Sequence, residues 1–173
     1  METAVFGGGC FWCTEALFKN LKGVISVIPG YSGGDVKNPS YEEVSSGKTG
    51  HVESAKIEFD PKIISYEDLL YVFMKTHDPT QEDGQGADIG PQYQSTIFYL
   101  DNIQKDESEK IINKLQTDYD KKIATKLIQY KNFYKAEDYH KNYYENHKNA
   151  AYCKLVIDPK IVKLRQNFAD MLK

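Results

Sequence analysis

Apolar and polar positions recur along the chain at spacings typical of both strands and helices. Residues 52–59 alternate, so that positions 53, 55, 57 and 59 share one face of a predicted strand and the intervening positions share the other. Short apolar or β-branched runs predict further strands at 3–6, 24–28, 95–100 and 127–130.

Helices are predicted where apolar residues recur every three or four positions. The pattern between positions 10 and 21 predicts a helix whose first turn holds Cys10 and Cys13. Ser65 and Asp68 have the spacing of a helix N-cap and its reciprocal partner, which predicts a helix from position 65 onward. A helical turn is expected at 41–44 within a loop, and further helices are expected at 102–119, 137–147 and 159–172.

A long loop is expected at 78–94, which contains Gly84, Gly86, Gly90 and two prolines; such loops are usually functional or mobile. Strands and helices interleave without a regular βαβ rhythm. This order favours the α+β class, a two-layer sandwich of a mixed sheet with helices packed on it, around a ferredoxin-like core. We expect one catalytic domain over residues 1–173, in which residues 150–173 form a tail with the last cysteine and then a helix.

The composition limits the classes of partner. The 173 residues carry 22 basic and 25 acidic side chains and a net charge of -3, whereas nucleic-acid binding needs a basic excess on one face. No apolar run approaches the roughly 18 residues of a membrane helix. The N-terminus lacks the basic and apolar stretches of a signal peptide. We therefore expect no nucleic-acid or membrane partner.

Three cysteines are present, Cys10, Cys13 and Cys153, a number too small and odd for a structural disulfide framework. A reduced, cytoplasmic protein is therefore expected. In that compartment, neighbouring cysteines indicate redox chemistry or metal binding.

Cys10 follows Gly7-Gly8-Gly9 at the start of the predicted helix. A thiol attacks as the thiolate, and the N-terminus of a helix favours an anion. We therefore predict that the pKa of Cys10 is depressed and that the glycines leave its approach open. The alternatives are a small buried cysteine beside a glycine turn and a phosphate-binding loop, which the missing Gly-Lys-Ser/Thr ending disfavours.

Glu53 shares the predicted strand face with Ala55, Ile57 and Phe59, which should point into the core. A carboxyl group there loses hydration, so its pKa should rise and suit a general acid near neutral pH. A glutamate that reaches solvent from the strand end is the open alternative.

Several segments together resemble the A-type peptide-methionine sulfoxide reductases. Gly9-Cys10-Phe11-Trp12 resembles the signature of this family, and the further matches follow in the family's order. They are 30–34 (GYSGG), 38–44 (NPSYEEV), 49–53 (TGHVE), 77–81 (HDPTQ), 90–95 (GPQYQS) and 136–140 (AEDYH). The resemblance covers the chain from Phe6 to about Cys153.

The resemblance implies an activity and two central residues. Cys10 would attack the sulfoxide sulfur of the S epimer of methionine sulfoxide, free or within oxidised proteins, and Glu53 would protonate the oxygen. Cys10 would become a sulfenic acid, which condenses with a second thiol to a disulfide. Thioredoxin would reduce that disulfide, and no resident cofactor or metal is expected.

The resemblance also assigns the surroundings of the sulfoxide. Tyr41 and Tyr93 would hydrogen-bond its oxygen, Asp88 would steady the polar network, and Phe11 and Trp12 would house the methyl group. An aromatic wall suits a methyl group, and converging donors suit an oxygen that gains negative charge. Taken singly, the aromatic residues are as expected in a core, and Asp88 in a turn.

The resolving cysteine is the point at which this sequence departs from the family. Many members carry glycine where Cys13 stands, and many end in a glycine-rich tail with two recycling cysteines. Here a single late cysteine, Cys153, matches a recycling position, and it is favoured as the resolving thiol. Cys13 is the alternative, because a Cys-x-x-Cys pair at a helix start can form a disulfide. A relay through both, or a purely packing role for Cys13, stays open.

Three other functions compete with this one. A thioredoxin-like oxidoreductase could use Cys10 and Cys13, but a longer βαβ lead-in should then precede them. A zinc module could use these cysteines with His140 and His147, and a Cys-His hydrolase would pair Cys10 with a histidine. We expect His51, His77 and His140 to brace loops rather than to bind a ligand.

Overall fold

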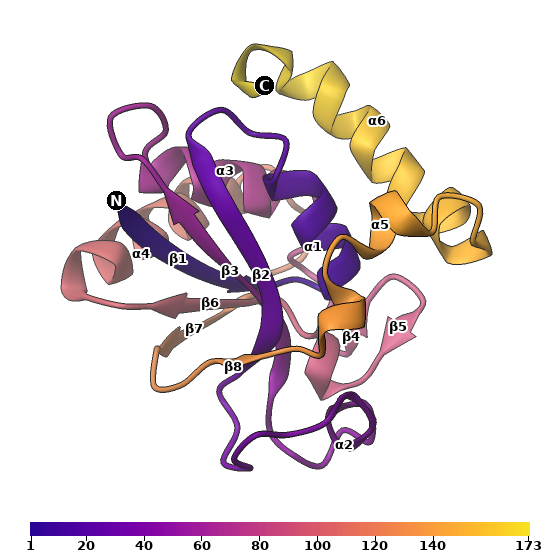
Figure 1. Ribbon diagram of the computed structural model, residues 1–173. Coiled ribbons are helices and arrows are strands. Elements are labelled where there is room, and N and C mark those ends of the chain that lie inside the picture. Colours follow the sequence, from indigo (N-terminus) through magenta and orange to yellow (C-terminus); the bar gives the residue numbers. More distant parts are fainter.

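A six-stranded sheet runs through the computed structural model, which describes residues 1–173 (Figure 1). The strands are β1 (Glu2–Gly7), β2 (Val24–Ser32), β3 (Val52–Phe59), β6 (Thr96–Tyr99), β7 (Lys126–Gln129) and β8 (Tyr134–Lys135). Their order is β7-β6-β1-β3-β2-β8. Only the pair β6 and β7 is parallel, so the sheet is mixed, as predicted.

The centre of the sheet has a ferredoxin-like arrangement. The chain runs β1, α1 (Phe11–Phe18), β2, β3, α3 (Tyr66–Lys75) and β6, and the four strands lie in the order β6-β1-β3-β2. This is a β-α-β-β-α-β unit whose strands pair antiparallel throughout. The predicted fold class is therefore confirmed.

The helices cover one face of the sheet, where the main core lies. Phe6 of β1 packs against Phe18 of α1 and stacks on Phe73 of α3. The long helix α4 (Asn102–Gln116) packs beside α3. The opposite face has a small cluster of Val5, Val52 and Phe98, covered by residues 130–133. Two layers result, as the sequence indicates.

The remaining elements, apart from α6, are short. They are α2 (Tyr41–Ser45), β4 (Gly84–Gln85), β5 (Asp88–Ile89), α5 (Tyr143–Asn146), α6 (Asp158–Asn167), the 3-10 turns η1 (Pro91–Tyr93), η2 (Asp138–His140) and η4 (Ala169–Met171), and a π-helical segment, η3 (Cys153–Ile157). The loop expected at 78–94 thus contains a two-stranded hairpin, β4 and β5. None of the helices combines the length and hydropathy that a membrane crossing requires.

The single helix predicted at 137–147 is wrong, because the segment breaks at Asn142. Asn142 adopts the left-handed conformation, with φ 56°, and separates η2 from α5. Its backbone N–H donates to Glu15 Oε1 at 2.7 Å, and its side-chain oxygen accepts from Lys19 Nζ at 2.8 Å. Since asparagine tolerates this conformation, the contacts with α1 outweigh the local preference for a continuous helix.

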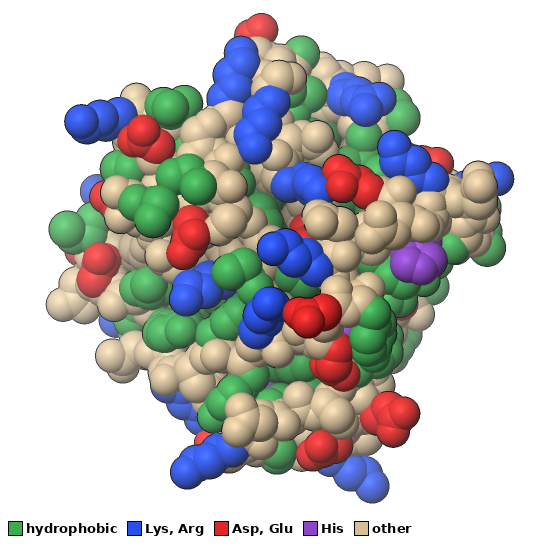
Figure 2. All heavy atoms as spheres, viewed as in Figure 1, with side chains coloured by type: hydrophobic (Ala, Val, Ile, Leu, Met, Phe, Trp, Pro, Cys, Tyr) green, Lys and Arg blue, Asp and Glu red, His purple; other side chains and the backbone are tan.

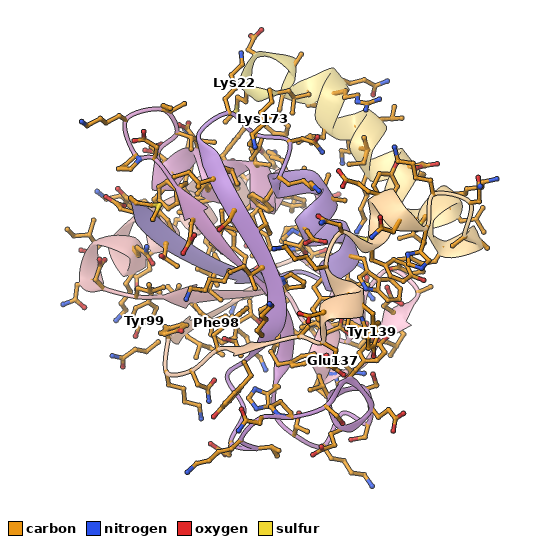
Figure 3. The ribbon with its side chains drawn as sticks, in the orientation of Figure 1. Lys22, Phe98, Tyr99, Glu137, Tyr139 and Lys173 are labelled. Atoms are coloured by element: carbon orange, nitrogen blue, oxygen red, sulfur yellow. The ribbon has the colours of Figure 1, made fainter.

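The C-terminal segment is held against the body of the protein. In Figure 1, α6 lies on the outer side of α1, which it contacts. Lys22 N donates to Met171 O at 2.8 Å and Lys173 N donates to Asn20 O at 2.9 Å. Figure 3 accordingly places Lys22 and Lys173 side by side. The helix predicted to reach position 172 ends at Asn167, because the last residues form these bridges instead.

Candidate active site

Cys10 lies at the N-cap of α1, directly after the turn from β1. Gly9 has φ +88°, and a Cβ atom there would lie 2.8 Å from Cβ of Gln85, so only glycine fits without displacement. Cys10 itself has an extended backbone, and its carbonyl accepts from Cys13 N at 3.1 Å. The glycine turn therefore places the cysteine at the mouth of the helix, as predicted.

Glu53 lies against the same helix mouth. Its Oε1 accepts the Phe11 backbone N–H at 3.3 Å, whereas its Oε2 has no hydrogen-bond partner. The side chain is 1% exposed. Burial, assisted by the negative charge of Asp88, raises the pKa of Glu53 to about 8, although the Phe11 N–H and Tyr93 oppose the shift. The prediction of a buried carboxyl group with a raised pKa is confirmed, and the Glu53 carboxyl group is mostly protonated at neutral pH.

The pKa of Cys10 departs from the prediction. Burial raises it well above the usual thiol value, and the charges of Glu53 and Cys13 add to this. The N–H of Trp12 acts in the opposite direction, as a helix N-terminus should. Loss of hydration is the larger effect here, so the predicted depression is wrong. Protonation of Glu53 removes one repulsive charge and thereby favours the Cys10 thiolate.

Tyr41 and Tyr93 both face this centre. They come from different elements, α2 and η1, and both are half-buried. Burial raises the pKa of Tyr41 to about 12, with further contributions from the charges of Glu53 and Cys10. The pKa of Tyr93 is also raised, by burial first and then by Glu53 and Tyr41. Both phenols therefore stay protonated and are available as hydrogen-bond donors beside Glu53.

Asp88 has a partner that the sequence did not reveal. Tyr152 donates its hydroxyl to Asp88 Oδ2 at 2.7 Å, and the Tyr152 hydroxyl oxygen lies 3.7 Å from Cys13 Sγ. Asp88 raises the pKa of Glu53, so it belongs to the same electrostatic centre. The only available signal for Tyr152 was its place directly before Cys153.

Trp12 forms an ordered aromatic surface. Its ring stacks on Tyr143 with centroids 3.7 Å apart and planes 7° apart, and it meets Tyr152 edge-on at 5.7 Å. The indole Nε1 donates to Nδ1 of His140 at 3.1 Å. The indole is half-buried, so one part of it remains available to a ligand.

Phe11 lies deeper than Trp12 and is fully buried. Its ring packs against Tyr31, Tyr41 and His140 with centroids 5.0 to 6.4 Å apart. The packing of Phe11 therefore supports the position of Tyr41.

Glu137 is a second residue that sequence reasoning missed. Its Oε1 accepts from the Tyr31 hydroxyl at 2.8 Å and its Oε2 accepts from Tyr41 N at 3.0 Å. Figure 3 shows Glu137 with Tyr139 on the turn that lies above α2. Glu137 therefore joins three segments and sets the position of Tyr41.

The histidines act as braces, as predicted. Nδ1 of His51 accepts from Gly34 N at 3.1 Å, and its Nε2 bonds to Val36 O at 2.7 Å. Nε2 of His77 lies 2.7 Å from Ser95 Oγ. His140 is buried and receives the Trp12 N–H. None of the hydrogen bonds in the structure joins a histidine to Cys10, as a Cys-His hydrolase would require.

The three cysteines are free thiols and all are buried. Cys13 lies in the first turn of α1, three residues from Cys10, and Cys153 begins η3 with no exposed surface. The pKa of Cys13 is raised mainly by burial, with a contribution from Cys153; Cys13 in turn raises the pKa of Cys10. The charge of Cys153 therefore affects the pKa of Cys13, and the charge of Cys13 affects the pKa of Cys10.

The structure does not contain the arrangements of residues that a zinc module or a thioredoxin-like oxidoreductase would need. No group of three or more His, Cys, Asp and Glu side chains is placed to hold a metal ion. A single strand, β1, precedes the two cysteines in place of the βαβ lead-in of a thioredoxin-like protein. Acidic and basic side chains are interspersed over the face drawn in Figure 2.

Comparison with known proteins agrees with this geometry. The family model "Peptide methionine sulfoxide reductase" matches residues 2–172. Peptide methionine sulfoxide reductase MsrA of Sulfolobus acidocaldarius is 54% identical over 170 residues, covering 98% of this chain and 97% of that protein. The MsrA of Thermus thermophilus is 51% identical over 172 residues, with 99% and 98% covered.

Solved structures give the same result. Mxr1 of Saccharomyces cerevisiae in its reduced form superposes with a TM-score of 0.84 and 32% identity, covering 88% of each chain. Mxr1 in complex with Trx2 superposes with a TM-score of 0.60 and 26% identity, covering 82% of this chain and 84% of that one. A thiol at a helix mouth, a neutral glutamic acid beside it and full-length similarity together show that the chain belongs to the A-type peptide methionine sulfoxide reductases, a family of thiol-dependent oxidoreductases.

Proposed function

We propose that the chain reduces the S epimer of methionine sulfoxide, free or within oxidised proteins, with Cys10 as nucleophile and Glu53 as proton donor. One observation carries this proposal. The Glu53 carboxyl group is 1% exposed, has a pKa of about 8 and contacts the backbone N–H of the residue that follows Cys10. A neutral acid next to a cysteine is what reduction of a sulfoxide requires.

The reaction transfers one oxygen atom and two electrons. The Cys10 thiolate attacks the sulfoxide sulfur while Glu53 gives its proton to the sulfoxide oxygen. The new bond between the Cys10 sulfur and the substrate sulfur then breaks together with the substrate's sulfur–oxygen bond. The oxygen transfers to the Cys10 sulfur, which becomes a sulfenic acid, and methionine leaves. The methionine sulfur gains two electrons, and the Cys10 sulfur loses them.

The surroundings of Cys10 suit the two ends of the substrate. The hydroxyls of Tyr41 and Tyr93 are donors for the oxygen as its negative charge grows. Burial keeps the carboxyl group of Glu53 neutral, and Asp88, held by Tyr152, adds to this effect. The half-buried indole of Trp12, stacked on Tyr143, is a wall for the methyl group, and the buried ring of Phe11 packs against Tyr41.

The sulfenic acid then condenses with a second thiol. The sequence favours Cys153, whereas the geometry favours Cys13 as the first partner, because Cys13 lies one helical turn from Cys10. The Cys10 carbonyl accepts from Cys13 N at 3.1 Å, so the two residues are joined across the first turn. Cys153 is completely buried in η3, and its charge contributes to the raised pKa of Cys13. We therefore place Cys153 second, in a relay from Cys10 through Cys13.

An external dithiol closes the cycle, and thioredoxin is the proposed reductant. The support is the yeast relative whose structure contains Trx2. All electrons then come from thiols, so the proposal needs no resident cofactor. Three free cysteines suit a reducing compartment such as the cytoplasm.

The test is an assay of the purified protein with dithiothreitol and each epimer of a methyl sulfoxide. Reduction of the S form and not of the R form is expected, and Cys10→Ser should abolish it. Equal turnover of both epimers, or activity that survives in Cys10→Ser, would contradict the proposal.

A further inference from the structure

A narrow cavity reaches Cys13 from the side of α6. It holds about 10 Å³ and is lined by Gly8, Cys13, Phe73 and Lys160 among others. Its residues Thr76, His77 and Lys160 also line a much larger cavity of about 800 Å³ between the end of α3 and α6. The two spaces therefore adjoin, and Lys160 stands at the junction.

The inner cavity beside Cys13 depends on the lack of a side chain at Gly8. A Cβ atom on Gly8 would lie 2.8 Å from Cε1 of the Phe73 ring and 3.5 Å from His77 Cδ2. Its absence lets the ring of Phe73 lie close to the backbone. The glycine run therefore shapes this inner cavity next to Cys13 as well as the turn that leads into Cys10.

Lys160 is the free cation of this region. It lies near the start of α6, is half-buried and takes part in none of the four ion pairs of the structure. Lys75, in the outer cavity, is paired with Asp118 at 2.7 Å. Lys163 lines only the outer cavity and is exposed. Lys160 is thus the one lysine that lines both cavities.

Lys160 lowers the pKa of Cys13. Burial raises the pKa of Cys13, and Lys160 is the strongest influence in the opposite direction, ahead of the Tyr152 hydroxyl. Asp88 and Cys153 raise the pKa further. Of the other titratable groups nearby, the Cys10 thiol cannot be positively charged. The ring of His77 is neutral at pH 7, because burial lowers its pKa to about 4. Lys160 is therefore the positive charge that faces this thiol.

We infer that Lys160 is a positioning residue for the recycling step, whose ammonium group stabilises the Cys13 thiolate that attacks the Cys10 sulfenic acid. In this step the Cys13 sulfur forms a bond to the Cys10 sulfur as the S–O bond breaks. Hydroxide leaves and takes a proton, giving water; the Cys10 sulfur is reduced and the Cys13 sulfur is oxidised. The inference rests on the proposed function, with Cys13 as the first partner.

Rapid mixing of the reduced enzyme with one equivalent of methyl sulfoxide separates the two steps. The methyl sulfide product reports the first step, in which Cys10 loses its free thiol, and the loss of a second free thiol reports disulfide formation. We expect Lys160→Met to slow disulfide formation about tenfold at pH 7.5 and to move its pH profile up by about one pH unit, since an opposite charge nearby favours the thiolate. Lys160→Arg should restore the profile, and Lys163→Met, in the same groove, should match the wild type.

A second measurement does not depend on turnover. In a Cys10→Ser, Cys153→Ser background Cys13 is the only cysteine left, so the pH dependence of its alkylation rate gives its titration, and Lys160→Met should raise its pKa. An unchanged titration would overturn the inference. So would an equal slowing of both steps in Lys160→Met without a shifted profile, which would indicate a structural effect. If the titration shifts but peptide mapping finds no Cys10–Cys13 disulfide, the resolving order in the proposed function fails, and the local effect of Lys160 stands.

Discussion

The backbone N–H of Phe11 donates to Glu53 Oε1 at 3.3 Å, which joins the first residue of α1 to the strand that carries the acid. One carboxyl oxygen is thereby held by the helix mouth, while the other, Oε2, is buried and has no partner. A buried polar oxygen without a partner is costly. This arrangement makes the proton of Glu53 available to a ligand that binds beside Cys10.

Replacing Glu53 with glutamine should remove the proton donor and keep the shape of the side chain. We expect Glu53→Gln to slow the first step about a hundredfold or more, since general acid catalysis typically contributes about that much. Single-turnover formation of methionine measures it. Glu58→Gln, on the same strand and partly exposed, is the matched control and should react normally. A normal rate in Glu53→Gln would remove Glu53 from the reaction.

The pH dependence of stability should also report Glu53. Its pKa is raised from about 4.5 to about 8, so the folded state binds the proton more tightly than the unfolded state. The contribution of Glu53 to stability is therefore complete below pH 4.5 and is lost as pH rises toward 8. We expect Glu53→Gln to exceed the wild type in free energy of unfolding at pH 9 by more than it does at pH 5. Urea unfolding at both pH values is the measurement, and an equal difference at both would contradict the shift.

Asp88 should contribute to the raised pKa of Glu53. Its negative charge raises the pKa of Glu53, so Asp88→Asn should lower that pKa. The alkaline limb of the pH profile of the first step should then move to lower pH. Glu82→Gln, an exposed change on the same loop, serves as the control. If the alkaline limb does not move in Asp88→Asn, Asp88 acts only through its hydrogen bond with Tyr152.

Single substitutions should distinguish the roles of the three cysteines. If Cys13 is the first partner, Cys13→Ser should complete one turnover and accumulate the Cys10 sulfenic acid. Cys153→Ser should still form the Cys10–Cys13 disulfide but should lose thioredoxin-supported cycling. Dimedone labelling and peptide mapping distinguish these states. A Cys10–Cys153 disulfide that forms at the wild-type rate in Cys13→Ser would instead support direct resolution by Cys153.

Gly9 should be required for stability at the helix mouth. Gly9→Ala combines φ +88° with a contact of 2.8 Å to Gln85, so we expect a loss of about 1–3 kcal/mol in the free energy of unfolding. Gly86→Ala is the matched control, because Gly86 also has a positive φ, +59°, but nothing lies within 4 Å of its Cβ position. Similar losses in both variants would mean that the contact with Gln85 contributes nothing.

Local pattern predicted much of this protein. Alternation placed Glu53 on the buried face of β3, the spacing of Ser65 and Asp68 placed the start of α3, and the glycine run placed Cys10 at the mouth of α1. Each of these depends on neighbours in the sequence, because strand faces, helix caps and turns are set by nearby backbone geometry. The resemblance of the motifs then added Tyr41 and Tyr93, which the structure brings to the same centre.

Other properties required the tertiary structure. The break at Asn142 depends on Glu15 and Lys19, more than a hundred residues away. The raised pKa of Cys10 depends on how completely the fold removes it from water, and the nearness of Lys160 to Cys13 depends on where α6 packs. Burial and electrostatic interactions are determined by residues distant in the sequence, so local patterns identify the reacting groups, and only the packed chain sets their protonation and their partners.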